Sequence, residues 1–331
     1  MSKPKKSDNK PGGHRRAGKP NSGNEEKAGP PQPMSRLDLE KQMAELGKLL
    51  NEQDFQSLDD VNDFLSGLMA EEDGIMPTRN PETPLEKAQE IIWEAMETEN
   101  PLKAIRLAQK ALKTSADCVD AYLLLADLQA ESLEEAYELT QQAVAAGERA
   151  LGAEMFEENR GHFWLIVETR PYMRARLQLG QMLWQLGRPS EAIEQYRELL
   201  ELNPNDNQGV RYGLLISLMQ MCRDEEAAEL IAQFDDDAFA VWNYNRALLT
   251  FRQHGRGPEA DAALNAALDV NEYVPDYLLG YADMPFDDDM PDMHGWGDEA
   301  EAILYTAQAM VIWLQTPGAQ MWLAERYDAL D

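Results

Sequence analysis

The stretch 173-MRARLQLGQMLWQLGRPSEAIEQYRELLELNPND-206 decides the fold of this chain. Apolar residues recur in it at helical spacing on both sides of Gly187-Arg188, where a tight turn is expected. Gly180 before the turn and Ala192 after it are small residues at which two helices can approach closely, and Pro204 ends the unit. The stretch therefore predicts a helical hairpin.

The length of this hairpin and the positions of its small residues, turn and proline resemble a tetratricopeptide repeat. The small residue at which the second helix approaches the first is called the small anchor. It recurs at Ala104, Ala136, Ala192, Ala227 and Ala260. A second packing position lies seven residues further along each second helix. It recurs with the same gaps as the small anchor, at Ala111, Ala143, Leu199, Phe234 and Ala267. The long gap after Ala136 indicates an insertion at about 147–171, so we predict five repeat units over 84–272.

The sequence outside these units has a different character. Residues 1–34 are basic and rich in Pro, Gly and Ser, which predicts a disordered tail. Residues 35–80 predict an N-terminal helical segment and linker, and 273–331 predict an acidic loop followed by capping helices. The expected fold class is all-α: a right-handed solenoid of tetratricopeptide-type helical hairpins, extended at the N-terminus and capped at the C-terminus.

Composition narrows the possible partners and the expected location. The 331 residues include 30 Lys and Arg against 60 Asp and Glu, a formal net charge of −30 that disfavours general nucleic-acid binding. The basic tail leaves open a contact with RNA or anionic lipid. No secretory signal and no run of about 18 apolar residues is found, so we expect no membrane span. Cys118 and Cys222 are expected to be buried thiols, and a cytoplasmic location is the expectation.

Four segments carry a second, narrower resemblance. GHFWLIVETRPYMRARLQLGQMLW, LNPNDNQGVRYGLL, YVPDYLLG and GDEAEA resemble the suppressor of tumorigenicity protein 7 family and its bacterial relatives. The likeness covers roughly 150–305. Members of that family carry N-terminal membrane segments, and the resemblance implies no activity.

The sequence contains no motif of an enzyme, a cofactor site or a metal site. The four histidines have no neighbour at ligand spacing, and no phosphate-binding glycine loop occurs. Asp287, Asp289 and Asp292 do not follow the spacing of a calcium loop. We therefore expect neither catalysis nor a cofactor. The alternative is a metal-dependent hydrolytic or cation-binding site in the acidic loop 287–299, with the insertion around His162.

Charge is distributed unevenly over the helices of the last three units. The expected first helices, 169–187, 207–223 and 238–256, contain eight arginines and no carboxylate. The expected second helices, 190–206, 224–237 and 259–272, contain 16 carboxylates and one base, Arg197. In tetratricopeptide proteins the first helices line the concave surface, so the resemblance implies a cationic groove. Alternatively, the arginines pair with carboxylates of the chain itself.

The repeat register selects the residues that could face such a groove. They are Arg174, Gln181, Trp184, Tyr212, Met219, Trp242, Asn245, Arg246 and Arg252. Arg176 and Arg211 fall at a position that usually packs between helices, so we expect them to be structural. The predicted function is a non-catalytic scaffold or adaptor that binds an acidic or C-terminal peptide of a partner protein. A self-associating structural protein is a further alternative, and the sequence leaves the oligomeric state open.

Overall fold

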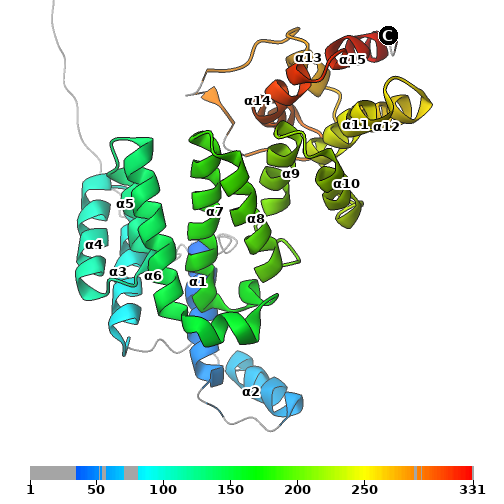
Figure 1. The fold of residues 1–331 in the computed structure, drawn as a ribbon. Helices are drawn as coiled ribbons and strands as arrows, with labels where there is room; N and C mark the ends of the chain where they lie inside the picture. The colour runs from blue at the N-terminus through cyan, green and yellow to red at the C-terminus, as the bar shows by residue number, and fades with distance from the viewer. Residues whose placement is uncertain are drawn as a thin grey trace, which may run out of the picture.

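The computed structural model describes residues 35–51, 53, 57–70, 81–286, 289–291 and 293–329. Every regular element in these ranges is helical, and the chain is an all-α solenoid (Figure 1). Ten helices pack as successive hairpins: α3(Pro84–Glu97), α4(Pro101–Thr114), α5(Val119–Leu128), α6(Leu133–Asn159), α7(Arg170–Gln185), α8(Pro189–Leu202), α9(Val210–Gln220), α10(Asp224–Gln233), α11(Ala240–His254) and α12(Pro258–Val270). The predicted tail of residues 1–34 lies outside the described residues.

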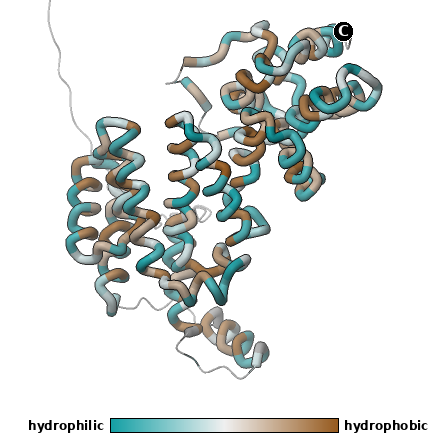
Figure 2. Tube along the Cα trace, viewed as in Figure 1, coloured by the Kyte–Doolittle hydropathy of each residue, from teal (hydrophilic) through white to brown (hydrophobic). Residues whose placement is uncertain are grey.

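Local signals place the beginnings of these helices. Thr83 forms a capping box with Glu86 ahead of α3, where Pro84 takes the first helical position. The side chains of Asn100 and Ser132 cap α4 and α6 by accepting backbone hydrogen bonds. Figure 2 shows apolar and polar residues alternating along each helix, as expected for helices with one buried side.

The hairpin of α7 and α8 has the predicted close approach. A Cβ atom added to Gly180 would lie 2.6 Å from the Tyr196 ring. A Cβ added to Gly213 of α9 would lie 3.2 Å from the same ring. The buried Tyr196 ring therefore lies between two glycines of neighbouring first helices. Gly187 forms the turn with a φ of 70°, which favours glycine.

The small anchors of the second helices lie at the helix contacts. Ala104, Ala136, Ala192, Ala227 and Ala260 fall on α4, α6, α8, α10 and α12 in turn, and all five are buried. Alternate helices thus present a small side chain to the helix before them, which lets the two helices of each hairpin pack closely.

The insertion lengthens α6 and adds two short 3-10 turns, η1(Phe163–Leu165) and η2(Val167–Thr169). Gly152 breaks the helical geometry of α6 with a φ of 71°. Phe163 is buried and packs on Phe156 and Tyr172, with ring centroids 5.1 and 6.4 Å away. The insertion therefore contributes a small aromatic core of its own.

Helices from both ends of the chain cover the inner face, which we define as the side formed by the first helices α3, α5, α7, α9 and α11. α1(Arg36–Asn51) lies against α3, α7 and η2, and α2(Leu58–Ala70) follows it. At the other end, α13(Val274–Leu278) leads to α14(Glu299–Gln315), which packs on α9 and α11. α15(Ala319–Tyr327) packs on α12, α13 and α14. Within the described residues, no helix has the length and apolar character needed to cross a bilayer.

We predict that Gly180→Ala destabilises the protein. The added methyl group would overlap the Tyr196 ring, which Gly213 prevents from moving away, so overpacking should cost about 1–3 kcal/mol. Gly67→Ala is the matched control, because Gly67 is an exposed helical glycine with no atom within 4 Å of an added Cβ. Urea unfolding should show a loss of stability for the first variant alone. Equal midpoints for both variants would contradict the close contact.

Candidate functional site

The first helices position the predicted arginines, but most of these side chains already have partners within the chain. Arg174 of α7 donates to Asp120 of α5 at 2.7 and 3.1 Å and to Glu40 of α1 at 2.9 and 3.0 Å. Asp120 is 1% exposed. Burial lowers the pKa of Arg174, but the two carboxylates outweigh burial and raise it. Arg174 thus ties two repeats and the N-terminal helix together.

Arg252 of α11 joins three helix ends. Its guanidinium donates to the Met219 carbonyl near the end of α9 at 2.8 Å and to Asp224 at the start of α10 at 3.0 Å. It also donates to the Thr316 hydroxyl, just after α14, at 2.8 Å. Carbonyls at a helix C-terminus attract a cation, so this nearly buried arginine has a structural role. The prediction that it faces a groove is wrong, because α14 covers it.

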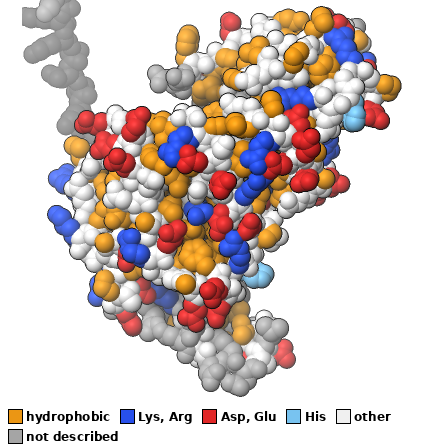
Figure 3. Space-filling model, viewed as in Figure 1, with side chains coloured by type: hydrophobic (Ala, Val, Ile, Leu, Met, Phe, Trp, Pro, Cys, Tyr) orange, Lys and Arg blue, Asp and Glu red, His pale blue; other side chains and the backbone are white. Residues whose placement is uncertain are grey.

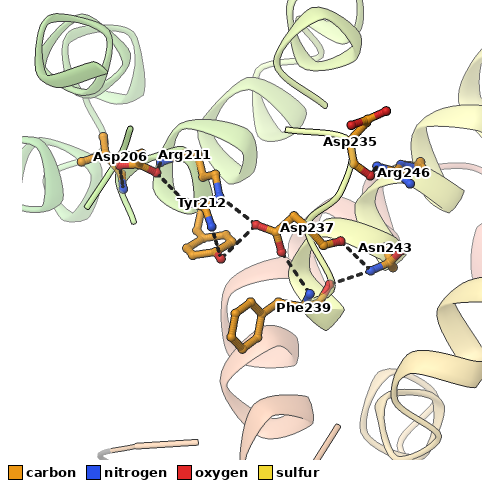
Figure 4. A network of polar contacts seen from close by, with 9 residues as sticks. Asp206, Arg211, Tyr212, Asp235, Asp237, Phe239, Asn243 and Arg246 are labelled. Atoms are coloured by element: carbon orange, nitrogen blue, oxygen red, sulfur yellow. Dashed lines mark hydrogen bonds and ion pairs between the residues drawn. The ribbon is translucent and has the colours of Figure 1, made fainter. Parts of the chain in front are cut away.

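A network of polar contacts surrounds Tyr212 (Figure 4). Arg211 pairs with Asp206 at 2.9 Å and with Asp237 at 2.7 Å, in agreement with its expected structural role. Burial, and then the Asp237 carboxylate, raises the pKa of Tyr212. The phenol therefore stays protonated and donates to Asp237 at 3.0 Å. Arg246 donates to the Asp235 carbonyl at 2.9 Å. The network fixes the Tyr212 ring.

Three other predicted site residues are buried. Met219, Trp242 and Asn245 are each 0% exposed, so the prediction that they face a groove is wrong. Asn245 lies under α14, where Tyr305 donates to its Oδ1 at 3.4 Å. Trp242 packs edge-on against Tyr212, with ring centroids 6.0 Å apart. The capping helix α14 covers the inner face at α9 and α11. The repeat register predicts which residues point to the inner face, but it does not show that another helix covers them.

The remaining three predicted residues come together in one pocket, which we call the amide pocket. Gln181, Trp184 and Tyr212 line a cavity of about 500 Å³ between α7, α9 and α14. The sequence analysis missed its other polar lining residues, Gln185, Gln208, Ser217 and Gln308. The helical period could have suggested Gln185, which is four residues after Gln181. No pattern in the sequence indicates Gln308, because it lies on α14, a helix far along the chain that reaches the pocket by packing on α9 and α11.

The amide pocket has no charged side chain among its lining residues. Its aromatic groups are Trp184, Tyr196 and Tyr212, and Gly209 and Gly213 supply backbone without side chains. Trp184 donates to Gln220 at 2.9 Å, which holds its indole in place. Figure 3 shows Lys and Arg side chains interspersed with Asp and Glu, so the face in view carries mixed charge. The pocket is therefore uncharged in a strongly acidic chain, and its polar amides lie beside aromatic side chains and the aliphatic Leu177, Val210 and Ile216.

The predicted acidic-loop site lies partly outside the described residues. Asp287 and Asp292 fall there, while Asp289 is described and exposed. Among the residues that the structure describes, no group of three or more His, Cys, Asp or Glu side chains is placed to hold a metal ion.

Residues 79–329 match the family model described as ST7 protein, a longer segment than the resemblance at 150–305. The chain belongs to the ST7 family.

Curated members share about a quarter of their residues with this ST7-family chain. The suppressor of tumorigenicity 7 protein-like of Homo sapiens is 28% identical over 253 residues, which cover 69% of this chain and 43% of the relative. The protein ST7 homolog of Drosophila melanogaster is 26% identical over 257 residues, or 70% and 47% of the two chains. This chain thus spans less than half the length of these relatives.

One solved structure is also similar to this chain. YrrB, whose crystal structure is described as that of a TPR protein with an unusual peptide-binding site, is 20% identical to the ST7-family chain. The TM-score is 0.40, and the match covers 62% of this chain and 91% of YrrB.

We predict that Arg252→Met destabilises the fold. The variant keeps the aliphatic stem but leaves Asp224 and the covered helix-end carbonyls without their donor, which should cost about 2–4 kcal/mol. Arg256→Met is the matched control, because Arg256 forms an exposed pair with Glu325 that should contribute at most about 1 kcal/mol. Thermal and urea unfolding would measure both, and similar losses for the two variants would contradict the structural role of Arg252.

The two cysteines should differ in reactivity. Cys118 is buried, and burial, followed by the Asp120 charge, raises the pKa of its thiol to about 12. Cys222 is exposed, so the expectation of two buried thiols was wrong for Cys222, which lies in a turn with a φ of 54°. Because the thiolate is the reactive form, iodoacetamide near neutral pH should label Cys222 and spare Cys118 until the protein unfolds. Mass spectrometry would measure the labelling, and equal rates in the folded protein would contradict this difference.

Proposed function

We propose that this ST7-family chain is a non-catalytic interaction scaffold that binds an extended, uncharged polar segment of a partner protein in the amide pocket. The observation that carries the proposal is the neutral lining of glutamine, serine and aromatic side chains. The volume of the amide pocket, about 500 Å³, falls within the range of ligand-binding cavities, about 300–1,000 Å³.

The chemistry of the lining suits a peptide backbone. A glutamine amide both donates and accepts hydrogen bonds, as each peptide unit does. Gln181 and Gln185 lie four residues apart on α7, so they share one side of the helix, and both are exposed. Gln208 lines the same pocket, and its Oε1 is buried without a hydrogen-bond partner, so a rotation of this amide toward the pocket would give the oxygen a peptide N–H as partner.

The aromatic side chains provide the contact area that amides lack. Trp184 and Tyr212 are half-buried, and each is held by a hydrogen bond to a neighbouring helix or turn. Rigid aromatic residues lose little side-chain entropy on binding and are frequent anchors of interfaces. A peptide would therefore meet a pocket that needs little rearrangement.

The ion pairs favour a neutral peptide over the acidic one predicted from the sequence. Arg174 and Arg252 already bind carboxylates of the chain, and Arg246 binds a carbonyl. An acidic ligand would have to replace these contacts, and it would also approach a chain with a net charge of −30. Acidic or C-terminal peptides are therefore the competing outcome of the test.

The test is selection of short random-sequence peptides on the immobilised full chain. Peptides without net charge should be enriched, and Gln181→Ala/Gln185→Ala should weaken the binding of selected peptides about tenfold, or about 1.4 kcal/mol. The matched control is Gln141→Ala/Gln142→Ala, which removes two exposed glutamines from α6 and should change nothing.

Two results would overturn the proposal. Selected peptides that bind both double variants equally would place the binding surface elsewhere. Enrichment of acidic peptides would indicate that the arginines of the first helices bind the partner, in place of the amide pocket.

A further inference from the structure

Ion pairs and partly buried apolar side chains hold the N-terminal helix α1 on the inner face. Glu40 accepts two hydrogen bonds from Arg174, and Lys41 pairs with Glu97 of α3. About two turns further along α1, Lys48 lies 3.5 Å from Glu86 of α3. We call the surface under α1, formed by α3, α6, α7 and η2, the α1 seat.

The α1 seat contains a cavity that α1 does not fill. The cavity measures about 420 Å³, and its apolar lining includes Leu85, Trp93, Val119, Leu151, Val167 and Tyr172. α1 presents Ala44 to it, the only buried side chain among those of α1 that the structure describes. Leu39 of α1 is 52% exposed. The smallest apolar side chain of α1 therefore lies over this cavity.

Such a helix should dissociate easily. A helix of 16 residues is marginal on its own in water, so the order of α1 depends on its contacts with the seat. Partly exposed ion pairs contribute about 0–1 kcal/mol each. Among the described side chains of α1 only Ala44 is fully buried, and the apolar contribution of the partly buried Leu37, Met43, Leu46, Leu49 and Leu50 is smaller than that of a fully buried helix face. α1 thus belongs to the least stable part of the described fold.

The arginine of the seat that binds Glu40 is oriented by residues outside α1. Asp120 binds Nε and one terminal nitrogen of Arg174, and Gln89 donates to the same carboxylate at 3.0 Å. The other terminal nitrogen, which binds Glu40, is therefore held in position by residues that do not belong to α1. A carboxylate from another helix would find the arginine already oriented.

We propose that the α1 seat is a binding site for an amphipathic helix of a partner protein, and that α1 is its exchangeable occupant. The partner helix carries a carboxylate at the position of Glu40 and a large apolar residue four positions later, where α1 has Ala44. Residues at this spacing share one helix face, so the carboxylate reaches Arg174 while the apolar side chain enters the cavity. A basic residue four positions further on takes the place of Lys48 opposite Glu86. This site is separate from the amide pocket and does not depend on it.

The test uses the full chain and fluorescent peptides with the sequence of residues 35–51. A peptide with Ala44→Leu should bind the wild-type chain more tightly than the native peptide does, as measured by fluorescence anisotropy. A peptide with both Ala44→Leu and Glu40→Lys should not bind, because its lysine would face Arg174.

Two chain variants act in opposite directions on this binding. Glu40→Lys in the chain weakens the tethered competitor, so the Ala44→Leu peptide should bind about tenfold more tightly. Ala44→Leu in the chain fills the cavity from within, so the same peptide should bind more weakly and the melting temperature should rise. The Gln181→Ala/Gln185→Ala chain should bind the peptide as the wild type does, which separates this proposal from the amide pocket.

Three results would overturn the proposal. The first is no binding of the Ala44→Leu peptide to either the wild-type or the Glu40→Lys chain. The second is equal binding of the peptides with and without Glu40→Lys. The third is exchange of α1 between copies of the chain, seen as dimers of the wild type by light scattering, which would make a second copy the occupant.

Discussion

The contact of the Tyr196 ring with Gly180 and Gly213 determines how α7, α8 and α9 are spaced. The ring is buried, and a side chain at either glycine would press on it, so the three helices have little freedom to move closer or apart. Tyr196 also lines the amide pocket together with residues of α7 and α9. The contact that packs the central repeat therefore also sets the width of the pocket.

The charges of the chain follow from the same stacking. Stacking brings arginines of the first helices close to the acidic starts of neighbouring helices, as with Arg174 and Asp120 or Arg252 and Asp224. Buried charges require such partners, because an unpaired charge away from water is costly. The arginines of the first helices thus neutralise some of the carboxylates of this acidic protein. The lining of the amide pocket, which remains open, is uncharged.

The sequence predicted the features that depend on neighbouring residues. The turn at Gly187 and the small anchors of the second helices are local signals, and each lies where it was expected. The contacts of Glu40 with Arg174 and of Asn245 with Tyr305 join residues 134 and 60 positions apart. No periodicity encodes such pairs, so the sequence could not show which parts of the inner face are covered.

The two covering helices differ in how firmly they are held. α14 buries Ala302, Tyr305, Ala309, Ile312 and Trp313, so removing it would expose a large apolar area at a cost of about 1.5–3 kcal/mol for each large side chain. Among its described side chains α1 fully buries only Ala44, and its other contacts are partly exposed ion pairs and partly buried apolar side chains. The C-terminal cover is consequently part of the core, while the N-terminal cover rests on a cavity lined by both apolar and acidic side chains, and we propose that it can exchange. The inner face is therefore covered firmly by α14 at its C-terminal end and is open at the amide pocket. At its N-terminal end it has a cover, α1, that another helix can replace.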